Sequence, residues 1–342
     1  MPSTSPYTEP PPLPAGHTRS RPVRADVSEI FALMSACNTA VIGHPDYTED
    51  EVADELAEPD FDPARDGWLV RDPGGHLVGW GWACRKGTSE TVDVDVYHLP
   101  TEPAVGAWLW HFVQRRAVEL AAGLGHPRAV VDAACYSEDT DRAGRLSGFG
   151  FAVATVFYRL FIAHDPHRPR PMPAPPPNID LRSTSNGPEV RRDAWAVHQT
   201  AFADHFGFVA KSYSDWLRHL EAHSTHDWSL GEVAYVDDRP AGLVLRSNAF
   251  LPDEASGYVA LLAVHPDKQG RGLGRLLLRR ALAADAADLR RGTFLHVDTD
   301  PSRPALNLYL GEGMRPVQII DAWRRIVPTA RPAPPRYDPA PR

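Results

Sequence analysis

Hydrophobic and polar positions follow the same order twice along the chain. Each copy contains an acidic helical stretch that starts at a tyrosine, "YTEDEVADEL" from Tyr47 and "YSDWLRHL" from Tyr213. In each copy two strand-like runs joined by a turn follow, over residues 67–82 and 231–245. Because the same patterns recur in the same order, we expect two modules of similar structure.

The second part of each copy begins with a strand that ends in proline. The strands "TVDVDVYHLP" and "GYVALLAVHP" precede helical patterns over residues 103–122 and 272–289. A further strand, a short helix and a closing strand, "ATVFYRLFI" or "VQIIDAWRRIV", complete each copy. This order predicts the α+β class, with two tandem domains that each hold a mixed, mostly antiparallel sheet flanked by helices.

Proline marks the expected domain boundaries. The chain has 34 prolines, and proline-rich segments open the chain, separate the two modules and close the chain. Such segments cannot pack a core. The predicted organisation is a disordered tail over 1–22, a first domain over 23–163, a linker over 164–178, a second domain over 179–327 and a disordered tail over 328–342.

Charge and cysteine content narrow the class of protein. The formal net charge of −8 argues against broad nucleic-acid binding, which needs a basic surface. No apolar run reaches the length expected of a membrane span, and no signal-peptide core opens the chain. Cys37, Cys84 and Cys135 match no metal or redox spacing. We therefore expect a cytoplasmic protein with reduced thiols, monomeric or homodimeric, without nucleic-acid or membrane partners.

A glycine-rich turn, "QGRGLG" over 269–274, lies between a predicted strand and a predicted helix. Free N–H groups at a helix start form an anion site, and glycine lets phosphate oxygens approach the backbone. Arg271 and Arg275 add positive charge at the same place. A pyrophosphate is the expected ligand. The alternative is a tight connection whose arginines are merely solvated.

These residues carry a family resemblance. "LLAVHPDKQGRGLGRLLL", followed by "ALNLYLGEGM", resembles the GNAT superfamily of acetyl-CoA-dependent N-acetyltransferases. Gln269, Gly272 and Gly274 match its Q/R-x-x-G-x-G/A motif. The family's A-x-x-L-Y-x-x-x-G pattern is matched by Ala305, Leu308, Tyr309 and Gly313. The tandem layout is similar to that of mycothiol synthase.

The resemblance implies acetyl-CoA as co-substrate, no metal, and a role for each matching residue. The backbone of Leu262, Ala263 and Val264 would pair with the pantetheine arm and polarise the thioester carbonyl. Tyr309 would protonate the leaving thiolate, unless it is a core tyrosine. The turn would hold the pyrophosphate through Gln269, Gly270, Arg271, Gly272, Leu273, Gly274 and Arg275.

The acceptor site and the general base are less defined. Tyr258 is expected among the substrate-binding residues; it stands where we align a glutamate of mycothiol synthase, so this chain lacks that base. Asp253 and Glu254 could activate the amine through water, or form a solvated acidic loop. Asp204 and His205, in "AFADHFGF", could bind or deprotonate the amine, or cap a helix end.

Three further histidines raise the question of a metal. His219 and His223 are spaced i, i+4 on a predicted helix, and His226 follows. No acidic residue accompanies them at a metalloprotease spacing, so solvated side chains are the favoured interpretation.

The first module is expected to be a degenerate copy. Aligned on the strand that ends in proline, it places Pro103, Gly106 and Trp108 opposite Gln269, Gly272 and Gly274. Proline lacks an N–H donor, and tryptophan would fill the space that a phosphate needs. The position opposite Tyr309 holds Leu146 instead.

The sequence thus predicts an acetyl-CoA-dependent N-acetyltransferase that acts on a primary amine of a small molecule. The amine would attack directly in a ternary complex, in the second domain. Two alternatives remain at this stage: a protein or peptide N-acetyltransferase, and a non-catalytic acyl-CoA-binding regulatory protein.

Overall fold

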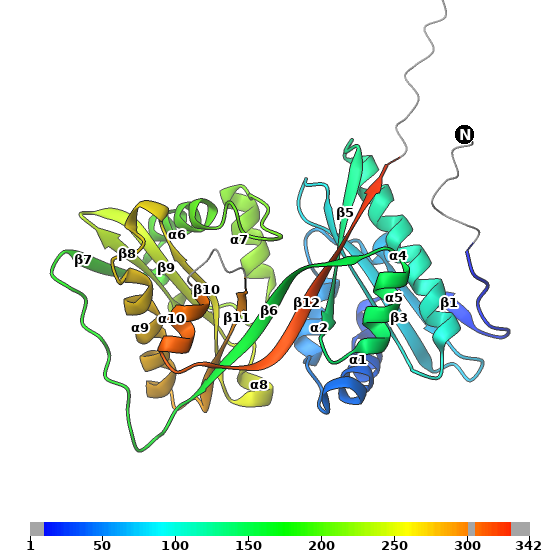
Figure 1. The fold of residues 1–342 in the computed structure, drawn as a ribbon, viewed down its shortest axis with the longest axis horizontal. Helices are drawn as coiled ribbons and strands as arrows, with labels where there is room; N and C mark the ends of the chain where they lie inside the picture. The colour runs from blue at the N-terminus through cyan, green and yellow to red at the C-terminus, as the bar shows by residue number, and fades with distance from the viewer. Residues whose placement is uncertain (1–9, 300–304, 330–342) are drawn as a thin grey trace, which may run out of the picture.

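In the computed structural model, which describes residues 10–299 and 305–329, one sheet runs through both halves of the chain (Figure 1). Its strands lie in the order β1-β2-β3-β4-β5-β12-β6-β11-β10-β9-β8-β7. We refer to residues 10–163 as the N-terminal half and to residues 179–329 as the C-terminal half. The strands are β1 (Thr18–Ser20), β2 (Gly67–Arg71), β3 (Leu77–Arg85), β4 (Thr91–His98), β5 (Arg128–Tyr136), β6 (Ala152–Ala163), β7 (Ile179–Ser183), β8 (Gly231–Val236), β9 (Arg239–Ser247), β10 (Gly257–Val264), β11 (Gly292–Asp298) and β12 (Arg315–Pro328).

Helices cover both faces of this sheet. The α-helices are α1 (Val27–Ile42), α2 (Glu49–Leu56), α3 (Pro63–Asp66), α4 (Pro103–Gly123), α5 (Thr140–Gly148), α6 (Pro188–Ala201), α7 (Tyr213–Ala222), α8 (Leu251–Glu254), α9 (Leu273–Ala287) and α10 (Ala305–Gly311). Helices α4, α5, α9 and α10 lie on the face towards the viewer in Figure 1. Adjacent strands are antiparallel except for β4–β5 and β10–β11. The predicted α+β class, with a mixed and mostly antiparallel sheet flanked by helices, is confirmed.

Local sequence explains why these elements form where they do. Along β8, Val233 and Tyr235 pack against α6 and α7, while Ala234 packs in the core under α9, as the period of two in a strand requires. Helix α2 starts with a capping box, in which Glu51 N donates to Thr48 Oγ1 at 3.1 Å and Thr48 N donates to Glu51 Oε2 at 2.8 Å.

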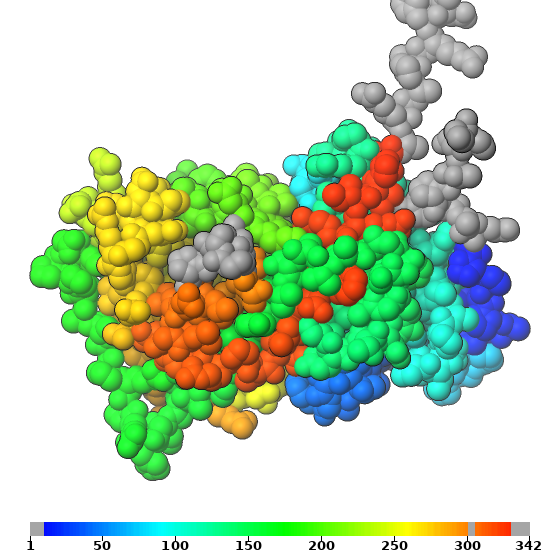
Figure 2. Space-filling view, viewed as in Figure 1, coloured from blue at the N-terminus to red at the C-terminus, as the bar shows by residue number. Residues whose placement is uncertain are grey.

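The two closing strands are exchanged between the halves. β6, from the N-terminal half, pairs with β11 from Gly292↔Ala163 to Asp298↔Phe157. β12, from the C-terminal half, pairs with β5 along nine residue pairs. In the space-filling view, orange and red residues of β12 lie among green and cyan residues of the N-terminal half (Figure 2). The sequence prediction left each closing strand in its own module; the structure places it against the other module.

Local patterning explains why this exchange was missed. Both halves present a similar strand edge, at β5 and at β11, and both closing strands carry suitable apolar residues. A hydrophobic pattern identifies a strand, but it does not identify the partner when two equivalent edges exist. The 164–178 segment connects the exchanged strand β6 to β7. It forms neither helix nor strand and contacts α9 through a hydrogen bond from Arg280 Nη1 to Pro173 O (2.8 Å).

The N-terminal boundary also differs from the prediction. Residues 18–20, expected in a disordered tail, form β1 and pair with β2 in the register Thr18↔Arg71 to Ser20↔Leu69. Three strand residues after a proline cluster are too few for a periodicity signal, whereas an open sheet edge can still bind them. At the other end, Pro328, which the prediction placed in the closing tail, is the last residue of β12 and pairs with Arg128. Residues 1–9 and 330–342 lie outside the described residues, so those parts of the two predicted tails stay a prediction.

One helical segment qualifies as a membrane span by length and composition alone. Residues 24–42 have a mean hydropathy of 1.3 over an 18-residue window, so the sequence-based statement that no run has that length needs this correction. In the structure, Ile30 and Met34 of this segment are fully buried and pack on Leu69 and Trp80 of the sheet. Of the hydropathic window, 22% is buried, so the helix packs on the sheet with one face, as an amphipathic helix of a globular protein does.

The contact between the exchanged strand and β11 can be tested at Gly292. A Cβ atom there would lie 2.2 Å from the Phe161 ring and 2.6 Å from Ile162 O, both on β6. Gly292→Ala is therefore expected to lower the free energy of unfolding by about 2 kcal/mol in urea titrations. Gly144→Ala in α5, where a Cβ would meet nothing within 4 Å, is the matched control and should change stability by less than about 1 kcal/mol. Equal stability of the two variants would contradict the β6–β11 pairing.

Candidate active site

The glycine turn of the C-terminal half is open towards solvent. Gly270 and Gly272 have φ values of 74° and 80°, in the left-handed region that favours glycine. A Cβ atom added at either residue would meet nothing within 4 Å. Gly272 is the N-cap of α9, and its carbonyl accepts the helical hydrogen bond from Leu276 N at 3.0 Å. The preceding amides, over 273–275, have no intrahelical acceptor and are suited to an anion.

Strand β10 leads into this turn and has an open edge. Within the described residues, β10 pairs with β11 over 257–259, whereas its pairing with β9 continues to Val264. A bulge in the β9 pairing follows Val259. The two parallel strands therefore separate beyond residue 259, and the backbone of Leu262 and its neighbours is left with an open side. Gln269 Nε2 donates to Val264 O at 3.2 Å and ties the turn to the end of the strand.

The two predicted turn arginines differ in their surroundings. Arg271 is exposed at the tip of the turn. Arg275 Nε instead lies 3.1 Å from Glu312 Oε1, and Arg279 binds the second oxygen of the same carboxylate at 2.7 Å. Glu312 is thereby held at the end of α10. A phosphate at the turn would have to share Arg275 with this carboxylate.

Tyr309 lies under the same turn. Its side chain is 7 % exposed and packs in the core between α9, α10 and the sheet. Leu308, beside it, lies 3.6 Å from where a Cβ of Gly274 would be. Burial raises the pKa of Tyr309 to about 12, so the phenol keeps its proton at neutral pH. A protonated phenol is the form that an acid for a leaving thiolate requires.

A cavity of about 720 Å³ lies where the two halves meet. The predicted residues Tyr258, Asp253 and Glu254 line it. Asp204 and His205 do not appear among its described lining residues; they lie in the loop after α6, where the His205 ring stacks on Phe202 with centroids 4.2 Å apart. The turn at 269–275 does not line the cavity either. β10 connects the two features, because Tyr258 stands near its start and Val264 at its end.

A hydrogen-bonded chain crosses this cavity from one half to the other. The Tyr258 hydroxyl and His296 Nδ1 are 3.0 Å apart, and Arg159 Nε donates to His296 Nε2 at 3.0 Å. Arg159 in turn forms a two-point ion pair with Asp46, at 2.5 and 2.8 Å. The Tyr136 hydroxyl donates to the same carboxylate at 2.5 Å. Arg159 comes from the exchanged strand β6, so the exchange is what brings these residues together.

This hydrogen-bonded chain determines the protonation of His296 and whether Tyr258 donates or accepts a hydrogen bond. Burial, and next the charge of Arg159, lower the pKa of His296 to about 4, so the ring is neutral at pH 7. Because Nε2 accepts from Arg159, the ring proton resides on Nδ1 and is donated to the Tyr258 oxygen. Burial raises the pKa of Tyr258 to about 12. Tyr258 is therefore a hydrogen-bond donor towards the cavity and not a base.

Glu254, predicted as a base, lies at the rim of the cavity. Its side chain is 42 % exposed, and Oε2 is 3.8 Å from Arg291 Nη1. Burial, and next the charges of Glu254 and Asp46, raise the pKa of the neighbouring Asp253. The two carboxylates thus differ in their surroundings: Glu254 is solvated beside an arginine, and Asp253 takes up a proton more readily than an ordinary aspartate does.

Sequence reasoning missed His296, Arg159 and Asp46. For His296 and Arg159 the sequence held a weak signal, namely a polar residue within an otherwise apolar strand. His296 stands two residues from Phe294 on one face of a strand, and Arg159 interrupts the apolar closing strand. Nothing local connects Arg159 with Asp46, which is 113 residues away in the chain.

The N-terminal half lacks the turn. Helix α4 already starts at Pro103, so Gly106, the counterpart of Gly272, lies inside the helix, and its N–H donates to Glu102 O at 3.2 Å. A Cβ on Gly106 would lie 2.4 Å from the His98 ring. Trp108 is buried in the core with 4 % exposure. Helix α4 thus begins one turn earlier than α9 does. Backbone amides that stay open in the C-terminal half take part in helical hydrogen bonds in the N-terminal half.

The strand opening of the N-terminal half is filled by Arg142. β4 pairs with β5 over 91–93 and then separates, as β10 does from β11. Arg142 occupies the position on α5 that corresponds to Ala305 on α10; its Nη1 donates to Val96 O at 3.1 Å and its Nη2 pairs with Asp95. Val96 is the counterpart of Leu262. A buried guanidinium therefore binds the strand edge that remains open in the C-terminal half.

The neutral state of two buried histidines can be tested by pH. Burial lowers the pKa of both His296 and His198 to about 4. A histidine that is harder to protonate when folded destabilises the fold as pH falls from about 6.5 towards 4. We expect His296→Asn to lose about 2 kcal/mol less of its unfolding free energy than wild type between pH 7 and pH 5.

The comparison with the variant is needed because Glu55 acts in the opposite direction: burial raises its pKa to about 8, so its contribution improves as pH falls. Urea titrations at both pH values give the difference, and identical losses for the two proteins would contradict a neutral, buried His296.

This architecture, with an open helix N-terminus beside a split strand pair, is that of an acyltransferase. The model of the acetyltransferase (GNAT) family matches residues 189–312, from α6 to α10. Mycothiol acetyltransferase of Beutenbergia cavernae is 30% identical over 265 residues, which cover 73% of this chain and 80% of that protein. The chain belongs to the GNAT family of acetyltransferases.

Solved structures share the tandem fold. A GCN5-related N-acetyltransferase from Sphaerobacter thermophilus superposes with a TM-score of 0.75 at 21% identity, covering 93% of this chain and 98% of that one. A tandem GNAT protein from the clavulanic acid biosynthesis pathway gives a TM-score of 0.67 at 18% identity and covers 93% of this chain and 100% of that one. The predicted tandem GNAT acyltransferase is therefore confirmed.

Proposed function

We propose that the protein transfers an acetyl group from acetyl-CoA to a primary amine of a small molecule, with one working site in the C-terminal half. The contrast between the halves carries this proposal. The C-terminal half combines an open glycine turn with an open strand edge, whereas the N-terminal half has a helical turn at the first place and Arg142 at the second.

The geometry of β10 suits the coenzyme. With the pyrophosphate on the amides after Gly272, the pantetheine arm would run back along the open edge of β10. Six residue steps separate Val264 from Tyr258, or about 20 Å at the rise of a strand. Because the pyrophosphate would lie beyond Val264, at the turn, an extended pantetheine chain would bring the thioester to the open edge near Leu262, from which β10 continues to the cavity.

The reaction then needs stabilisation of an oxyanion, a proton for the leaving thiolate and removal of a proton from the amine. Each of these needs has a candidate group. Backbone N–H at the open edge near Leu262 would stabilise the oxyanion that forms when the amine attacks the thioester carbonyl. Tyr309 would give its proton to the leaving thiolate. The amine must first lose a proton, and Asp253 or Glu254 would accept it through water. Direct attack in a ternary complex requires no covalent enzyme intermediate.

The cavity favours a small, cationic acceptor. Its volume of about 720 Å³ lies within the usual range for small-molecule sites. Its lining has more acidic than basic side chains: Asp46, Glu51, Asp95, Asp139, Asp141, Asp253 and Glu254 against Arg142, Arg145, Arg159 and Arg291. Tyr258 would donate a hydrogen bond to an oxygen of the acceptor. Roles for Asp204 and His205, and a cytoplasmic location, stay predictions.

Thiol release from acetyl-CoA with a panel of amines tests this function. The panel includes amino sugars, amino-acid derivatives and the amine precursor of mycothiol, with an N-terminal peptide for the protein-acetylation alternative. We expect release to depend on one class of small amine. If coenzyme binds and no amine increases release, the protein is an acyl-CoA-binding regulator instead.

A further inference from the structure

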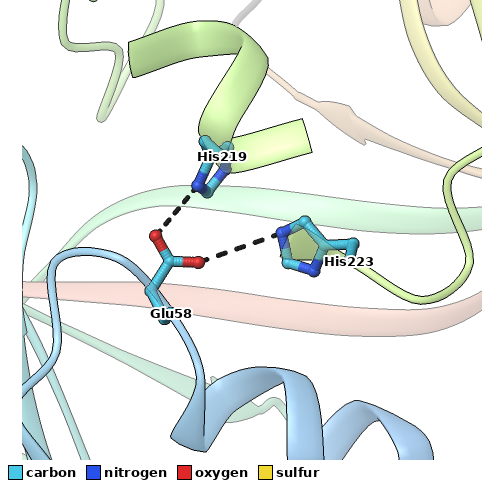
Figure 3. Close-up of side chains that lie close together, drawn as sticks. All are labelled: Glu58, His219 and His223. Carbon is cyan, nitrogen blue, oxygen red and sulfur yellow. Dashed lines mark hydrogen bonds and ion pairs between the residues drawn. The ribbon is translucent and has the colours of Figure 1, made fainter. Parts of the chain in front are cut away.

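A cluster outside the acetyl-transfer site joins the two halves. Glu58 follows α2 in the N-terminal half, while His219 and His223 lie on and just after α7 in the C-terminal half (Figure 3). His219 Nδ1 is 2.9 Å from Glu58 Oε1, and His223 Nε2 is 4.0 Å from Glu58 Oε2. One ligand atom from each residue lies within 4.8 Å of the other two. The acidic partner that the histidine spacing lacked in sequence is supplied from 161 positions away.

The donor set matches what a zinc-type cation requires. Two imidazole nitrogens and a carboxylate oxygen form one of the protein ligand sets of Zn²⁺, with a water at the fourth position. Bonds of about 2.0–2.1 Å place tetrahedral ligand atoms about 3.3 Å apart. Contacts of 2.9 and 4.0 Å bracket that spacing. His223 can close the wider gap by side-chain rotation, because it is 41% exposed and its backbone is extended (φ −81°, ψ 124°).

A second carboxylate is placed to orient one ligand. Asp54 accepts hydrogen bonds from Ser224 N at 2.8 Å and Ser224 Oγ at 2.9 Å, and its Oδ2 lies 4.0 Å from His223 Nδ1. When Nε2 of a histidine binds a metal, Nδ1–H usually donates to such a carboxylate, which fixes the ring. Asp54 faces the nitrogen of His223 that is not turned towards Glu58.

We propose that Glu58, His219 and His223 form a divalent transition-metal site, of the Zn²⁺ class, that ties α2 to α7 across the two halves. In the metal-free state a hydrogen bond joins His219 Nδ1 and Glu58 Oε1, and the metal would take its place. The site is separate from acetyl transfer: none of its three ligands lines the central cavity among the described residues.

Metal titration of the full chain tests the site. After removal of metal with a chelator, Co²⁺ is added and its visible absorption recorded, and Zn²⁺ is then used to displace it. We expect one equivalent to bind, with the intense absorption of a four- or five-coordinate ion. Glu58→Gln and His223→Gln should each weaken binding about 10- to 100-fold, the range for disturbed metal sites. At one Zn²⁺ concentration, the melting temperature of wild type should also rise by more than that of either variant.

Two controls separate ligation from folding. His76→Gln removes a histidine that also faces a carboxylate, Asp72 at 3.2 Å, but lies in an exposed hairpin; it should bind Zn²⁺ like wild type. His223→Gln leaves the Glu58–His219 hydrogen bond in place, so its loss of metal cannot be attributed to a broken contact between the halves. Wild type that releases Zn²⁺ as readily as Glu58→Gln on dialysis, or that shows an octahedral, water-like Co²⁺ spectrum, would overturn the proposal.

Discussion

Gly272→Trp is expected to weaken acetyl-CoA binding by about a hundredfold or more. The indole would occupy the space in front of the open amides, where an added Cβ now meets nothing within 4 Å. Loss of two charge-assisted hydrogen bonds to a pyrophosphate costs about 3 kcal/mol or more, which is this factor in affinity. Calorimetry with acetyl-CoA measures the effect.

Backbone strain has to be separated from lost contacts. Gly272 has φ +80°, so any side chain there costs about 1–2 kcal/mol of stability. Gly75 offers a matched control: its φ is +87°, a Cβ there also meets nothing within 4 Å, and it lies in the turn between β2 and β3. Gly75→Trp should lose a similar amount of stability and keep full affinity. Unchanged affinity in Gly272→Trp would refute the assignment of the turn.

Tyr309→Phe is expected to lower kcat roughly a hundredfold while KM for acetyl-CoA stays nearly constant. The lost group is an acid that acts as the thiolate leaves, and general acid catalysis typically contributes 10²–10⁴-fold. Within the described residues, the structure gives the Tyr309 hydroxyl no hydrogen-bond partner, so the variant leaves no described polar group unpaired. Stopped assays of thiol release at saturating amine give both constants.

Tyr158→Phe is the control for this variant. Tyr158 packs on the same core cluster as Tyr309 but belongs to β6 and does not line the cavity among the described residues. It should retain wild-type kcat. A Tyr309→Phe enzyme as fast as this control would remove Tyr309 from the chemistry and leave it a core residue.

Much of the site near the turn could be predicted because its signals are local. Gly270 and Gly272 need left-handed backbone at one connection, and Tyr309 follows at a short distance in the chain. Strand alternation and helix periodicity also depend on neighbours in the chain, so the order of elements from each hairpin to each closing strand was predicted correctly, whereas the edge strands β1 and β7 were missed. The residues of the acceptor site could not be predicted from local sequence, because they come from segments far apart in the chain. Glu254 and Tyr258 reach the cavity, but Asp204 and His205 are absent from its described lining.

By itself, the sequence determined the α+β class, the repeated order of elements, the coenzyme-type turn and the loss of that turn in the first copy. Only the tertiary structure decided that β6 and β12 change places, that Arg142 fills one strand opening, that Arg159 reaches His296, and that Glu58 meets His219. The physical reason is the range of the interactions. Backbone conformation and side-chain periodicity are set within a few residues, whereas strand partners and buried ion pairs join segments more than a hundred residues apart and depend on which of two similar edges each strand meets.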